Sequence, residues 1–89
     1  MTDIIRLPDE LGHQLRAHRE ALGLSKSDLA KRAGKVREVV YRLEAGDDTT
    51  VSSLLAVLGA LGLAVRLERA GLPSAREVAR RFLDDDDAS

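Results

Sequence analysis

The side chains of this 89-residue sequence that could take part in binding chemistry are concentrated between positions 26 and 42. Six basic and two acidic residues give that stretch a net charge of +4, whereas the whole chain has a formal net charge of −1. The basic residues are Lys26, Lys31, Arg32, Lys35, Arg37 and Arg42. Lysine and arginine at this density attract phosphate groups, and arginine can also pair with the edge of a guanine base. The stretch therefore indicates an anionic ligand.

An acidic run near the C-terminus explains why the total charge is nearly neutral. The run Asp84–Asp87 supplies four of the fifteen acidic residues, and without it the formal charge would change from −1 to +3. The chain therefore combines a basic patch with an acidic tail.

Other kinds of chemistry find little support in the sequence. There is no cysteine, so disulfides and thiolate metal sites are excluded. His13 and His18 are five positions apart, which places them on different faces of a helix and not together at a metal ion. No strained glycine elbow, paired catalytic carboxylates or cofactor motif is present. We expect a protein that is not an enzyme and that binds neither a cofactor nor a metal.

The composition also limits location and ligand class. No apolar run approaches the roughly 20 residues of a membrane span. The first ten residues, MTDIIRLPDE, lack the layout of a signal peptide. Tyr41 and Phe82 are the only aromatic residues, too few to stack the bases of single-stranded nucleic acid. We expect a cytoplasmic, nucleoid-associated protein without membrane contact.

Local signals predict four helices before position 63. The first begins at Pro8 and ends at Gly23, and its periodic positions are Leu11, Leu15, His18 and Leu22. The second is capped by Ser25 with Asp28 in capping-box spacing, and it ends at Ala33 before Gly34. The third runs from Val36 or Arg37 to Gly46, and the fourth from a Thr49 or Thr50 cap to Gly62. The residues expected to face inward on these three helices are Leu29, Ala30, Ala33, Val40, Leu43, Leu54, Leu55, Val57, Leu58 and Leu61.

Three of these residues have the spacing of a helix-turn-helix. Ala30 is small enough for the next helix to cross over it, and Gly34 can adopt the positive φ that a short turn requires. Val40 is the apolar residue that fixes the following helix. The sequence therefore predicts that the basic residues lie on a helix pair joined by a tight turn.

After Gly62 the apolar period changes from helical to alternating. Leu63, Val65 and Leu67 alternate with more polar residues, as in a strand with one wet face. A lone strand needs a partner, which is either the N-terminal segment DIIRL or the same strand of a second copy. We favour the second copy.

The C-terminal segment is predicted to form a last short helix. Ser74 and Glu77 have capping-box spacing, and Val78 and Phe82 share a face. The expected organisation is an arm over residues 1–8, a helix-turn-helix domain over 9–62, a dimerisation strand over 63–70, and a helix with an acidic tail over 71–89.

The stretch from Leu11 to Gly46 resembles the XRE/Cro-type helix-turn-helix family through LGHQLRAHREALGLSKSDLAKRAG and YRLEAG. The following DDTTVSSLLAVLGALGLAVRL looks like the segment that closes HipB-type antitoxins. The resemblance implies a mainly α, lambda-repressor-like bundle of four to five helices. Its one short C-terminal β-strand would pair across a dimer. It also implies a structural ion pair between Arg19 and Glu44.

The resemblance and the charge pattern together predict the DNA contacts. We expect base contacts from Val36, Arg37, Glu38, Tyr41 and Arg42, and phosphate contacts from Lys26, Lys31, Arg32 and Lys35. The chain departs from the family at two positions. Lys35 replaces a small apolar residue, and Val36 stands where a serine or threonine usually caps the third helix.

Three functions remain open at this point. The first is a homodimeric repressor of a palindromic operator, acting as a HipB-like antitoxin with a HipA-like kinase toxin as partner. The second is a solitary XRE-family regulator without a toxin. The third is a protein-interaction module that uses the C-terminal helix and the acidic tail.

Overall fold

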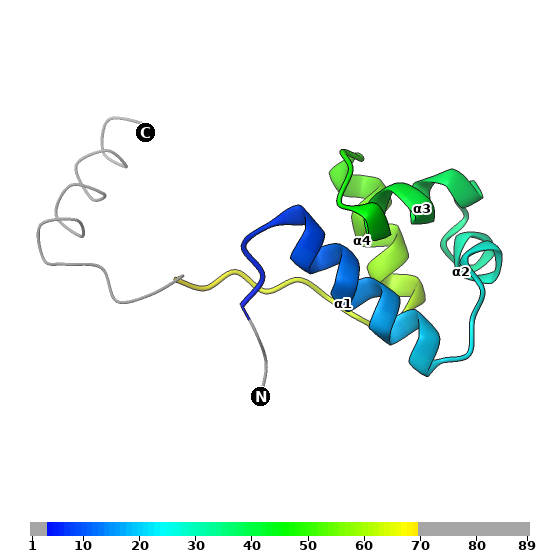
Figure 1. Cartoon of the computed structure of the whole chain (residues 1–89), viewed down its shortest axis with the longest axis horizontal. Helices are drawn as coiled ribbons and strands as arrows, with labels where there is room; N and C mark the ends of the chain where they lie inside the picture. Colours follow the sequence, from blue (N-terminus) through cyan, green and yellow to red (C-terminus); the bar gives the residue numbers. More distant parts are fainter. Residues whose placement is uncertain (1–3, 70–89) are drawn as a thin grey trace, which may run out of the picture.

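The computed structural model describes residues 4–69 of the chain. This part contains four helices: α1 (Pro8–Ala21), α2 (Lys26–Ala33), α3 (Arg37–Ala45) and α4 (Val51–Ala60) (Figure 1). Helix α3 packs against α1, α2 and α4, and α2 also packs against α4. The expected mainly α, helix-turn-helix bundle is thereby confirmed.

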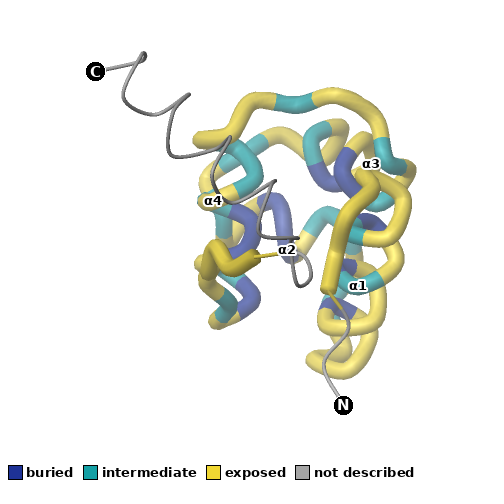
Figure 2. Tube along the Cα trace, turned by 90° about the vertical axis from the view of Figure 1, so that its left-hand side faces the viewer, coloured by how far each residue is buried: buried dark blue, intermediate teal, exposed yellow. Residues whose placement is uncertain are grey.

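The core is aliphatic, and each helix contributes to it. The largest fully buried side chains are Leu15 of α1, Leu29 of α2, Val40 of α3 and Val57 of α4. Figure 2 shows buried positions on the sides of the helices that face one another. Each such side chain contributes about 1.5–3 kcal/mol through burial. The remaining buried apolar residues are Ala30, Leu43, Leu58 and Leu61.

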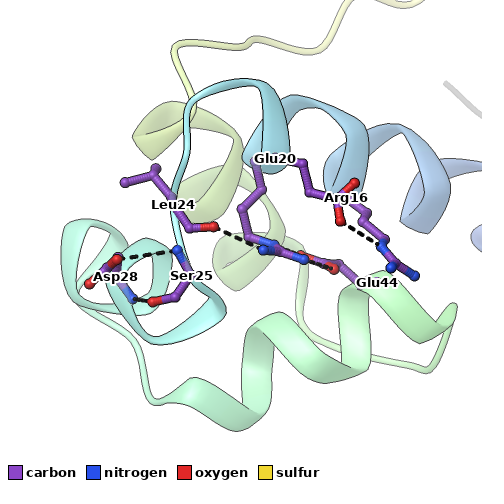
Figure 3. Close-up of polar contacts among 7 residues, drawn as sticks. Arg16, Glu20, Leu24, Ser25, Asp28 and Glu44 are labelled. Atoms are coloured by element: carbon purple, nitrogen blue, oxygen red, sulfur yellow. Dashed lines mark hydrogen bonds and ion pairs between the residues drawn. The ribbon is translucent and has the colours of Figure 1, made fainter.

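The helix ends are determined by local hydrogen bonds. The Ser25 hydroxyl accepts from the Asp28 N–H at 3.0 Å, and the Asp28 carboxylate accepts from the Ser25 N–H at 3.2 Å (Figure 3). This is the predicted capping box. Thr50, and not Thr49, caps α4 by accepting from the Ser53 N–H at 3.1 Å. All four helices are followed by a glycine with positive φ, namely Gly23, Gly34, Gly46 and Gly62.

Two helix faces differ in part from the periodic pattern of the sequence. His18 and Leu22 are exposed, and the α1 positions buried in addition to Leu15 are Gly12 and Arg19. A Cβ on Gly12 would lie 2.4 Å from the Glu44 carbonyl oxygen, so α1 and α3 cross here with no room for a side chain. Leu55, expected on the inner face of α4, is also exposed.

Residues 63–69 form no regular secondary structure in the described part of the chain. Leu63 packs against the core, but Val65 and Leu67 are exposed. No backbone hydrogen bond joins this segment to residues 4–7 within the range 4–69, so the intramolecular partner is not observed. Pairing with a second copy stays a prediction. The predicted C-terminal helix and the run Asp84–Asp87 lie outside the described residues.

Among residues 4–69, no helix is both long and apolar enough to cross a membrane.

Candidate nucleic-acid interface

The turn between α2 and α3 has a conformation that glycine adopts easily. Gly34 has φ 67° and ψ 32°, and its N–H donates to the Lys31 carbonyl at 3.1 Å. The Lys35 N–H donates to the Ala30 carbonyl at 2.9 Å. These two bonds form a Schellman motif, which satisfies carbonyls at the end of α2. A Cβ on Gly34 would meet no atom within 4 Å, so the requirement for glycine comes from the positive φ and not from space.

The orientation of α3 is fixed by a buried ion pair. Arg19 Nε donates to Glu44 Oε2 at 2.6 Å, and Arg19 Nη2 donates to Glu44 Oε1 at 3.1 Å. A third bond joins Arg19 Nη1 to the Leu24 carbonyl at 2.9 Å (Figure 3). The hydrogen bond to Glu44 raises the pKa of Arg19 above its ordinary value. One guanidinium therefore connects α1, α3 and the loop that leads into α2.

The five residues predicted to contact bases are all exposed at α3 or at its N-cap. Val40 and Leu43 of α3 are buried in the core. The exposed residues are Val36 at the N-cap and Arg37, Glu38, Tyr41 and Arg42 within the helix. Their side chains offer cationic, anionic, phenolic and apolar groups, which together suit the varied edges of base pairs in a major groove.

The N-terminus of α3 has no side-chain cap. Val36 stands at the N-cap position, makes no capping hydrogen bond and is 68% exposed. The N–H groups in the first turn of a helix form its positive end. In α3 this end is open to solvent and carries Arg37 as its first residue. The geometry suits an anionic group such as a phosphate.

The structure gathers two cations around Tyr41. Lys26 Nζ lies 4.0 Å from the centroid of the Tyr41 ring, and Arg37 Cζ lies 5.4 Å from it. Lys26 belongs to α2, whereas Arg37 and Tyr41 belong to α3. These ring contacts were not predicted from the sequence. The i, i+4 spacing of Arg37 and Tyr41 is a local signal for one of them, but the approach of Lys26 depends on how the helices pack.

The other residues predicted to contact phosphate do not all lie on the side of α2 that carries Lys26. Lys31 and Arg32 are exposed on α2, roughly 120–140° around its axis from Lys26. They lie three and four residues after Asp28, whose pKa is lowered first by hydrogen bonds with Ser25 and then by these two cations. Lys35 is half-buried in the turn. The structure thus brings Lys26 to the α3 surface and leaves Lys31 and Arg32 on another side of α2.

The comparisons with known proteins agree with this geometry. The family described as a helix-turn-helix domain matches residues 10–72. Because this match covers most of the sequence, the chain belongs to the helix-turn-helix domain family. No curated protein sequence gives a significant match.

Several solved structures are similar to the chain. One is a HipA–HipB–O2–O3 complex, with 25% identity and a TM-score of 0.73 over 79% of this chain and 100% of that chain. A HipB–O4 20mer complex gives 27% identity and a TM-score of 0.73 over the same shares. The clp gene regulator ClgR from C. glutamicum gives 27% identity and a TM-score of 0.60, over 73% of this chain and 85% of that chain.

The fold and the family define the class of protein as a DNA-binding regulator of the helix-turn-helix type. Within that class, the chain is similar to HipB, as its sequence indicates.

Proposed function

We propose that the protein is a sequence-specific transcriptional repressor that places α3 in the major groove of a palindromic operator. The observation that carries this proposal is the exposed face of α3, where Arg37, Glu38 and Arg42 are held away from the core by the Gly34 turn and the Arg19–Glu44 pair. Helix-turn-helix proteins insert this second helix into the major groove, with its N-terminal residues toward the bases.

The exposed residues predicted to contact bases, other than Tyr41, have chemically defined partners in this proposal. Arg37 pairs with a guanine or a phosphate, and Glu38 accepts from the amino group of a cytosine. Arg42 adds a second cation further along α3, while Val36 contacts thymine methyl groups or backbone phosphate. Lys26 and Lys35 bind phosphate and fix the register, while Lys31 and Arg32 add longer-range attraction.

We propose that the functional unit is a homodimer paired through residues 63–67. Val65 and Leu67 are exposed apolar residues, and a second copy would cover them while pairing the backbone of this segment. A two-fold dimer presents its recognition helices to half-sites about 34 Å apart, or a multiple of that distance. A palindromic operator follows from that symmetry.

We further propose that the protein is a HipB-like antitoxin that represses its own operon. Support comes from the similarity to HipB in a complex with an O4 20mer and in a complex with HipA and O2–O3. The partner of this chain would be a HipA-like kinase. A repressor of its own operon would act where that DNA lies, in the cytoplasm at the nucleoid.

A gel shift with a palindrome from the protein's own promoter tests the DNA-binding proposal. We expect specific binding in which log K falls with log salt by about 0.9 for each phosphate contacted. Arg37→Ala with Arg42→Ala should weaken specific binding by at least tenfold, because both residues face the bases.

The matched control is Lys31→Ala with Arg32→Ala, which removes the same charge from the other side of α2. It should cause a smaller loss, shared by specific and unrelated DNA. Equal losses for the two double variants, or binding that does not depend on salt, would refute the proposed interface.

A solitary regulator is the second candidate, and the similarity to ClgR favours it. Co-purification of the protein with the product of a neighbouring kinase-like gene would support the antitoxin. If the gene has no such neighbour and the protein still binds its operator, the solitary regulator is the better description.

The interaction-module alternative depends on residues 70–89, outside the described part of the chain. It would be favoured if Arg37→Ala with Arg42→Ala preserved the biological effect while truncation after Leu72 abolished it.

A further inference from the structure

Lys26 and Arg37 are each placed where a positive charge is electrostatically unfavourable. Each is the first residue of its helix, α2 for Lys26 and α3 for Arg37. The N-terminus of a helix is its positive end, so both cations are repelled by the helix on which they stand. They also repel one another, because both lie near the same ring. A group that attracts both cations would offset this repulsion.

Within residues 4–69, neither cation forms an ion pair with a carboxylate. The contact that both have is the face of the Tyr41 ring, at 4.0 Å for Lys26 and 5.4 Å for Arg37. The negative face of an aromatic ring attracts a cation within about 6 Å of its centroid. Tyr41 is 45% exposed and contributes nothing to the buried core. Its ring is therefore available for an electrostatic role.

We propose that Tyr41 is a positioning residue, whose ring holds Lys26 and Arg37 together on the DNA-facing surface of the free protein, so that DNA binding does not have to order these two side chains. This inference rests on the proposed DNA binding and adds a role for the ring. A long basic side chain loses entropy when it is immobilised by a ligand, and ordering it in the free protein reduces that cost.

Two variants separate the ring from the hydroxyl group. Tyr41→Leu removes the π face but keeps an apolar side chain, whereas Tyr41→Phe keeps the ring and removes the hydroxyl. In the free protein, the ring current of Tyr41 should shift the NMR signals of the Lys26 ε-methylene protons. We expect that shift to persist in the Phe variant and to vanish in the Leu variant, with melting temperatures to verify that both variants are folded.

Operator affinity gives the second measurement. Tyr41→Leu should weaken binding by roughly fivefold, because DNA must then order two mobile basic side chains. The slope of log K against log salt should stay unchanged, since both cations still reach the DNA in the complex. Tyr41→Phe should restore most of the lost affinity. By contrast, Lys26→Met should reduce the slope by about 0.9, because a phosphate contact is then removed.

The final measurement is a double-mutant cycle. In a Lys26→Met, Arg37→Met background, Tyr41→Leu should cause no further loss of affinity if the ring acts through these cations. A full additional loss, or equal losses for the Phe and Leu variants, would show that Tyr41 contacts DNA itself and would overturn the inference. If the wild-type protein does not bind DNA, both the inference and the proposed function fail. If it binds normally and the ring-current shift is absent, only the inference fails.

Discussion

At the scale of single residues, the Arg19–Glu44 pair joins α3 to α1 behind the proposed interface. Both side chains are nearly buried, with 10% and 5% of their surfaces exposed. A buried ion pair adds little net stability compared with apolar residues, but removing one partner leaves an uncompensated charge in the interior. The pair therefore acts mainly as a constraint on the position of α3.

This constraint can be measured by removing one partner or both. Glu44→Ala should destabilise the protein by about 3–5 kcal/mol, because the Arg19 guanidinium remains buried without its carboxylate. Arg19→Met combined with Glu44→Leu should lose clearly less, since no buried charge remains. Urea unfolding gives both values. A cost below about 1 kcal/mol for Glu44→Ala would show that the charge escapes to solvent and that the pair does not constrain α3.

At the scale of elements, the helix pair depends on its capped ends. Helix α2 has eight residues and α3 has nine, which is shorter than a helix that is stable alone in water. The Ser25–Asp28 capping box begins α2, and the Gly34 turn ends it. Packing of Leu29 and Val40 in the core supplies the remaining stability. Local capping and tertiary packing are both needed to present α3.

The capping box makes part of this stability dependent on pH. The hydrogen bonds with Ser25 lower the pKa of Asp28 in the folded state. A carboxyl group with a lowered folded pKa stabilises the fold above its unfolded pKa of about 4, and this contribution disappears as the pH falls through the folded value. Asp28→Asn cannot ionise, so it should remove that dependence. In melting curves from pH 2 to 7, the melting temperature of the wild type should exceed that of Asp28→Asn most above about pH 5.

The two melting temperatures should converge as the pH is lowered toward 2. Ser25→Ala serves as the companion variant, because it removes the cap at every pH and should cost about 1 kcal/mol. A constant difference between wild type and Asp28→Asn across the whole range would show that the charge of Asp28 does not contribute.

At the scale of the whole molecule, the described part of the chain leaves two apolar side chains near its end uncovered. Leu67 is 92% exposed and Val65 is 53% exposed, in a segment without regular secondary structure. Figure 1 shows this segment leading away from the end of α4. Exposed apolar side chains on an unpaired segment favour association with another chain. The proposed dimer would satisfy both its backbone and its side chains.

Leu67→Asp should dissociate the dimer without unfolding the protomer, because Leu67 makes no contribution to the core. Sedimentation should show a monomer, and operator affinity should fall by more than tenfold since two half-sites are no longer bound together. The control is Arg66→Ser, an adjacent residue whose side chain is 88% exposed on the other face of the alternation. A dimer that survives Leu67→Asp would rule out pairing through this segment.

The sequence predicted most of the fold because helix ends are local events. Ser25, Gly34, Gly46 and Thr50 set their boundaries through hydrogen bonds within a few residues, so the pattern was sufficient to place α2, α3 and α4. The predicted base contacts are exposed in the structure for a similar reason. The inward residues Val40 and Leu43 fix which side of α3 faces solvent.

Tertiary structure decided the features that depend on distant residues. The buried face of α1 contains Gly12 and Arg19, and not His18 and Leu22. At Gly12, α3 crosses α1 so closely that only a residue without a side chain fits beside Glu44. Likewise, Lys26 meets Tyr41 because packing of α2 on α3 brings together residues fifteen positions apart. The sequence alone therefore determined the helices and their surface chemistry, through local hydrogen bonds and periodicity. The tertiary structure decided which of those surfaces touch, since contact distances between helices depend on the packing of the whole core.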